Sequence, residues 1–77
     1  MFQFGIQFHS FEDVQRFVDM ATQFNFPIIV GNDHYSVNGT SFMGMFSLDY
    51  SHALTVRLNC SDEETVRFKE AAKSYLI

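Results

Sequence analysis

The strongest constraint on the fold is a strict alternation at the start of the chain. Apolar residues alternate with polar or small ones from Phe2 to Phe8, the period of two typical of a β-strand with one buried and one wet face. Residues 53–58 repeat the pattern, and residues 28–37 predict a hairpin around Gly31-Asn32-Asp33, with strands at Ile28–Val30 and His34–Val37. A sheet with one apolar face needs helices to cover it.

Two segments have the spacing of amphipathic helices. The first is expected over about Phe11–Phe24, after Ser10, and the Asn25-Phe26-Pro27 sequence ends it because proline disfavours helical geometry. The second opens with a capping box in which Ser61 is the N-cap and Glu64 the third helical residue. Its apolar face carries Thr65, Phe68, Ala72 and Tyr75.

Between the hairpin and the last strand lies an unusually apolar stretch, Val37–Leu48. Asn38-Gly39 predicts a turn, the Thr40-Ser41 pair can cap a helix, and five residues of sequence Phe-Met-Gly-Met-Phe follow. These apolar side chains exceed what one face of a short helix can bury, so we expect part of them, above all Phe42 and Met43, to face outward.

The predicted order is strand, helix, strand, strand, short helix, strand, helix. Four such strands form one mostly antiparallel sheet with the helices on its apolar face, an α+β open-faced two-layer sandwich. At 77 residues we expect a single domain over residues 1–77, because a chain of this length holds one small core.

Composition excludes several classes of function. A net charge of −4 with only five Lys and Arg residues argues against nucleic-acid binding, which needs clustered positive charge. A single Cys60, interpreted as a half-buried filler, favours a reduced, cytoplasmic protein, and we expect neither a membrane span nor a targeting segment. His34 and His52 lack partners at ligand spacing, so no metal or cofactor is expected.

The Val37–Leu48 stretch, together with Phe17–Ala21 in the first helix, resembles HPr, the histidine-containing phosphocarrier of the bacterial sugar phosphotransferase system. The resemblance implies a sheet with the last strand between the first and second. It also implies protein partners, namely enzyme I, HPr kinase and a transcriptional regulator. Of the family's two phosphorylation positions, the regulatory serine falls on Ser41 and the catalytic histidine falls on Ser10.

The substitution at Ser10 changes the chemistry. A phosphocarrier needs an imidazole that forms a labile phosphoramidate, whereas a serine phosphate is a stable ester. The family's arginine and proline after the histidine fall on Glu12 and Asp13, which cap the helix start and disfavour phosphate there. His9 is interpreted as a turn residue at the end of a strand, with a shifted phosphate acceptor as the alternative.

We therefore predict an HPr-like regulatory or interaction module without enzymatic activity. Phe42, Met43 and Phe46 would bind partners, and Ser41 is either a helix cap or a regulatory phosphorylation site. Thr40 replaces the family's basic residue before this serine, and Asp49 replaces a glycine after the short helix. The alternatives are an active phosphocarrier using His9 and an assembly module that dimerises through Phe42 and Met43; a monomer or weak dimer is expected.

Overall fold

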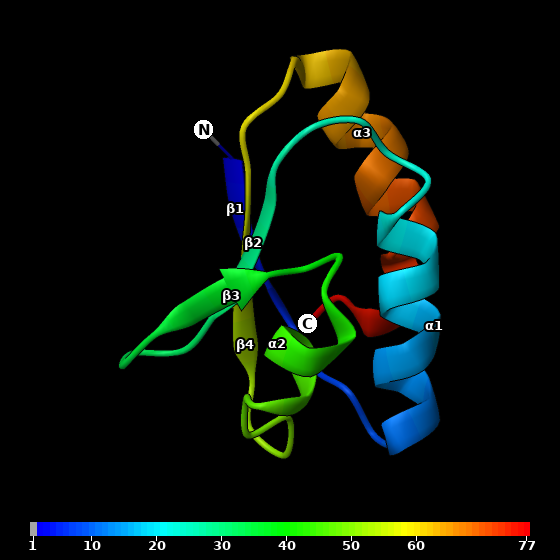
Figure 1. Cartoon of the computed structure of the whole chain (residues 1–77). Coiled ribbons are helices and arrows are strands. Elements are labelled where there is room, and N and C mark those ends of the chain that lie inside the picture. The colour runs from blue at the N-terminus through cyan, green and yellow to red at the C-terminus, as the bar shows by residue number, and fades with distance from the viewer. Residues whose placement is uncertain (1) are drawn as a thin grey trace.

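The computed structural model describes residues 2–77, and it contains the predicted elements in the predicted order (Figure 1). The elements are β1 (Phe2–Ile6), α1 (Phe11–Ala21), β2 (Ile28–Gly31), β3 (Ser36–Asn38), α2 (Phe42–Phe46), β4 (Leu54–Leu58), α3 (Asp62–Ala71) and a final 3₁₀ turn, η1 (Lys73–Tyr75).

The four strands form one sheet in the order β1-β4-β2-β3, and every pair is antiparallel. The last strand thus lies between the first and the second, as the resemblance implied. Val56 at the centre of β4 is paired with Phe4 of β1 on one side and with Val30 of β2 on the other. The helices cover one side of this sheet (Figure 1).

The alternation separates the two faces of the sheet. Ile6, Val30 and Val56 point into the core and have no exposed surface. Between these positions, Gln3, Thr55 and Arg57 are exposed on the open face. The sequence prediction of one dry and one wet face is confirmed, because side chains alternate sides along an extended strand.

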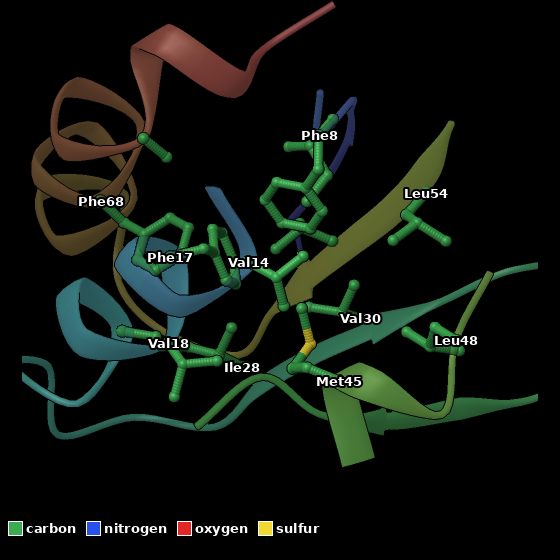
Figure 2. Packing of buried hydrophobic residues seen from close by; sticks show 14 of the residues in the cluster. Phe8, Val14, Phe17, Val18, Ile28, Val30, Met45, Leu48, Leu54 and Phe68 are labelled. Carbon is green, nitrogen blue, oxygen red and sulfur yellow. The ribbon is translucent and has the colours of Figure 1, made fainter. Parts of the chain in front are cut away.

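The core packs between this sheet and helices α1 and α3 (Figure 2). Phe17 of α1 is at its centre, and its ring centroid lies 5.3 Å from that of Phe8, 6.1 Å from that of Phe68 and 5.9 Å from that of Tyr75, all in edge-on geometry. Edge-on contact sets the positive ring edge against the negative face, which adds to the gain from burial. Eight of the ten phenylalanines lie in this core or pack against it, which lets a short chain build it.

Serine caps begin all three α-helices. The hydroxyl oxygens of Ser10, Ser41 and Ser61 each accept a hydrogen bond from the backbone N–H three residues later, at 3.2, 3.1 and 3.2 Å. At α3 the predicted capping box is complete, since the Glu64 carboxylate accepts from the backbone N–H of Ser61 at 3.1 Å. This bond and a second one from the Ser61 hydroxyl, at 3.0 Å, stabilise the charged form of the Glu64 carboxylate and lower its pKa.

Several predicted boundaries were wrong. Strand β1 ends at Ile6, although the alternation that predicted it continues to Phe8. Helix α1 ends at Ala21 rather than near Phe24, because the N–H groups of Gln23 and Phe24 bond to the third residue back and tighten the chain into a turn. Strand β3 begins at Ser36 rather than at His34, because the Asn32 side chain accepts from the backbone N–H groups of His34 and Tyr35 and holds them in the loop. Tyr75 lies in η1, beyond the end of α3.

The C-terminal end of the chain lies along β1, at one edge of the sheet. The N–H of Gln7 donates to the carbonyl of Tyr75 at 2.8 Å, and the N–H of Ile77 donates to the carbonyl of Gly5 at 3.2 Å. The C-terminal residues therefore cover β1, and β3 is the exposed edge of the sheet. Within residues 2–77, no helix has the length and apolar character that crossing a membrane requires.

Candidate functional site

Helix α1 follows Ser10, the residue that the sequence resemblance predicts to stand at the phosphocarrier histidine position. Ser10 is the N-cap in extended geometry, and its hydroxyl oxygen accepts from the N–H of Asp13 at 3.2 Å. The Asp13 carboxylate in turn accepts from the N–H of His9 at 2.9 Å and lies 3.8 Å from the Arg16 guanidinium. The helix start is thus capped by its own side chains, as the sequence predicted.

His9 is exposed, just outside this cap. Within residues 2–77, no hydrogen bond or ion pair orients its ring; only its backbone N–H is held, by Asp13. A phosphate arriving at His9 would meet the carboxylates of Glu12 and Asp13 in the first turn of α1. Like charges disfavour an anion there, although a helix start without such carboxylates attracts one.

Ser41 begins α2, the short helix of Phe42–Phe46. Its hydroxyl oxygen accepts from the N–H of Gly44 at 3.1 Å, so Ser41 acts as a helix cap. The preceding Thr40 is tied to the Asn38 side chain through both its N–H and its hydroxyl, at 3.1 and 2.7 Å. No charged side chain lies within α2 itself.

Helix α2 buries one side and exposes the other. Met45 and the following Leu48 are in the core, 1% and 3% exposed, whereas Phe42 is 40% and Met43 83% exposed. Phe46 is half-buried between the two groups. The predicted outward exposure of Phe42 and Met43 is confirmed, because Met45 and Leu48 take the available core space.

Phe11 extends this exposed surface and was missed by the sequence reasoning. It is the first residue of α1, yet its ring stacks on that of Phe46 with centroids 4.7 Å apart and an interplanar angle of 18°. The Phe42 ring lies 5.8 Å from Phe46 on the same surface. We call Phe11, Phe42, Met43 and Phe46 the apolar patch; it joins the start of α1, next to Ser10, to α2.

A polar cleft of about 490 Å³ lies beside the C-terminal end of α2. The link to α2 is Tyr35, whose hydroxyl donates to the carbonyl of Ser47 at 2.7 Å and whose ring lines the cleft. Asp33 and Asp49 bring two carboxylates to its walls, and His52 lies 3.5 Å from Asp49. Sequence reasoning had no signal for this cleft, because its residues come from the loop before β3 and from the loop and strand around the start of β4.

Asp49 does not end α2. The helix stops at Phe46 with Ser47 as its C-cap, and the Asp49 side chain instead accepts from the hydroxyl and backbone N–H of Ser51 in the following turn. These two hydrogen bonds stabilise the charged form and lower the pKa of Asp49. The carboxylate is therefore ionised at neutral pH.

One further candidate residue of the sequence analysis lies outside the apolar patch and the cleft. Cys60 is half-buried, with its sulfur 3.2 Å from the Thr65 hydroxyl, as expected of a filler. Across residues 2–77, no three His, Cys, Asp or Glu side chains come together as a metal-ion site would require.

Comparison with known proteins points in one direction. Residues 13–76 match the family described as the PTS HPr component phosphorylation site. Among solved structures, HPr-C-His from Thermoanaerobacter tengcongensis is 26% identical, with a TM-score of 0.75 over 94% of this chain and 90% of that one.

A second structure, the phosphocarrier protein HPr from Bacillus anthracis str. Ames, is also 26% identical, with a TM-score of 0.77 over 99% of this chain and 96% of that one. No curated protein matches the chain. The sequence match spans most of the chain, and the two solved structures share its overall fold. The chain belongs to the HPr family of the phosphotransferase system.

Proposed function

We propose that this HPr-family protein is a regulatory or protein-interaction module that does not transfer phosphate through the family's histidine position. The observation that supports the proposal is the start of α1, where the Ser10 hydroxyl caps the helix by accepting from the N–H of Asp13, and the Asp13 carboxylate accepts from the N–H of His9. The sequence resemblance aligns Ser10 with the family's histidine. A phosphate ester of serine is too stable to transfer its phosphate onward, unlike the phosphoramidate of histidine. The protein acts as one cytoplasmic domain over residues 1–77, without a cofactor and without activity as an enzyme.

Enzyme I with labelled phosphoenolpyruvate tests the loss of phosphotransfer. We expect no acid-labile label on the wild-type protein. The positive control is the HPr of the organism that supplies the enzyme I, which should be labelled under the same conditions. Hydroxylamine-sensitive label that disappears in His9→Ala would overturn the proposal and establish the rival, an active phosphocarrier using His9.

The apolar patch is the proposed docking surface for protein partners. Phe42, Met43 and Phe46 supply adaptable apolar area, and a largely exposed methionine suits contact with more than one partner. By family membership the first partners to test are enzyme I, HPr kinase and a transcriptional regulator. Met43→Ser should weaken binding about tenfold, as loss of a central contact does, whereas Val66→Ser, at an exposed position on α3, should not.

Self-association through Phe42 and Met43 is the second candidate, favoured by the same exposure. A dimer would hide this surface from other proteins. Light scattering at rising protein concentration tests it: a mass that stays monomeric excludes the dimer, and a dimer that Met43→Ser dissociates would establish it.

Ser41 is proposed as the regulatory phosphorylation site. A phosphate there would add about two negative charges beside the apolar patch and change which partners it accepts. HPr kinase with ATP should add one phosphate, and Ser41→Ala should abolish it. Ser61→Ala is the matched control, because the Ser61 hydroxyl caps α3 by accepting from the backbone N–H three residues later. If the wild-type protein remains unmodified, the regulatory role is refuted and Ser41 serves only as a helix cap.

A further inference from the structure

The net negative charge of the molecule comes from the part of the chain that carries the apolar patch. Residues 1–53 hold five of the nine acidic residues but only one of the five basic ones, so they account for the whole formal charge of −4. That one basic residue, Arg16, lies 3.8 Å from Asp13. Residues 54–77 are balanced in formal charge.

Carboxylates lie next to both helices that carry the apolar patch. At the start of α1, Glu12 follows Phe11 directly and is exposed. At the end of α2, the cleft joined to Ser47 through Tyr35 carries Asp33 and Asp49. Within residues 2–77, neither Glu12 nor Asp33 forms an ion pair, and the partner of Asp49 is His52, which is uncharged unless protonated.

We propose that the partner of the apolar patch is a protein segment with apolar anchor side chains next to lysine or arginine, and that one of these cations enters the cleft between Asp33 and Asp49. This inference rests on the proposed docking function and specifies its partner. The apolar anchors bury against Phe42, Met43 and Phe46, and the basic side chains neutralise the surrounding carboxylates.

Size and charge complementarity support this choice of occupant. A cleft of about 490 Å³ lies in the range of about 300–1,000 Å³ typical of ligand sites, which is ample for the end of one long side chain. An acidic segment would be repelled by the carboxylates around the patch. An anionic membrane surface is disfavoured for the same reason, because the charge of this part of the chain is negative.

Selection from a library of random displayed peptides tests the proposal without a known partner. The wild-type protein is the bait, and each selected peptide is then synthesised and its dissociation constant measured against four variants. These are Met43→Ser, the double variant Asp33→Asn with Asp49→Asn, and two controls on α3, Val66→Ser and Glu63→Gln. Circular dichroism checks that every variant is folded.

The expected result is a set of peptides with apolar anchors and a net positive charge. Met43→Ser should weaken their binding about tenfold. The double variant should weaken it by at least about two- to fivefold, the effect of losing one exposed ion pair. Added salt should weaken binding to the wild-type protein more than binding to the double variant. The two controls should bind like the wild type.

Two outcomes overturn the inference in different ways. Neutral or acidic peptides that still lose affinity in Met43→Ser would refute the basic partner but leave the docking surface standing. Peptides whose binding is unaffected by Met43→Ser, or no selected peptide at all, would refute the docking surface itself and the inference with it.

Discussion

Removing the Phe11 ring should cost stability although the side chain is at the surface. Phe11 is 46% exposed, so the buried part is about 100 Å², and at about 25 cal/mol per Å² its removal from water is worth about 2.5 kcal/mol. This is an upper estimate, because the unfolded chain also buries some apolar surface. We expect Phe11→Ala to lower the free energy of unfolding by about 2 kcal/mol.

Part of that loss belongs to the stacked contact with Phe46, 4.7 Å between centroids. A double-mutant cycle with Phe46→Ala isolates it, and we expect a coupling free energy of about 1 kcal/mol. The assay is urea unfolding followed by circular dichroism. In thermal unfolding, Phe11→Ala should lower the midpoint by about 10 °C, given the small size of the domain.

The control cycle pairs Phe11→Ala with Val66→Ser, which lies on a different helix with its side chain 67% exposed. Its coupling should be zero within about 0.3 kcal/mol. If the Phe11–Phe46 cycle gave a value equally close to zero, the stack would not hold α1 against α2. The continuity of the apolar patch would then lose its energetic basis.

Three further predictions concern the core, a close approach and a cap. Phe17→Ala should cost about 3–5 kcal/mol in urea unfolding; a loss below about 1 kcal/mol would contradict its central position. Gly39→Ala should cost about 1–3 kcal/mol, because the added carbon would lie 2.8 Å from an Ile28 methyl, whereas Gly5→Ala, whose nearest contact is 3.4 Å, should be close to neutral. The pKa of Glu64 is lowered in the folded state, so its stabilisation is present above its ordinary pKa and lost as the pH falls through the folded value. Glu64→Gln should therefore flatten the dependence of stability on pH in acid, and an unchanged pH profile would refute the role of this carboxylate.

Much of the fold follows from the sequence because short-range physics decides it. The alternation of Phe2–Phe8 and the helical spacing of Val14, Phe17 and Val18 each identify a face that must leave water. Serine at Ser41 and Ser61 marks where helices begin, since its hydroxyl satisfies an amide that the helix leaves free. The prediction that serine replaces the family's histidine at Ser10 likewise comes from the sequence alone.

Element ends were less predictable, because side chains that compete for backbone groups decide them. Asn32 holds His34 and Tyr35 out of β3, although their alternation predicts strand. The end of α1 depends on whether its last amides bond three or four residues back, and at Gln23 and Phe24 they bond three residues back. Such choices differ by little free energy, and the spacing of apolar residues carries no signal for them.

The surface that could bind a partner was decided by the tertiary structure. Three residues before Val14, Phe11 lies at a spacing that indicates the buried face of α1, yet it is half exposed because α1 begins beyond the edge of the core and meets α2 there. The cleft with Asp33 and Asp49 is lined by residues that are distant in the sequence, and the Tyr35 hydroxyl joins one of its loops to the end of α2. Sequence periodicity determined which face of each element is apolar, but only packing between distant elements determined where that face remains uncovered.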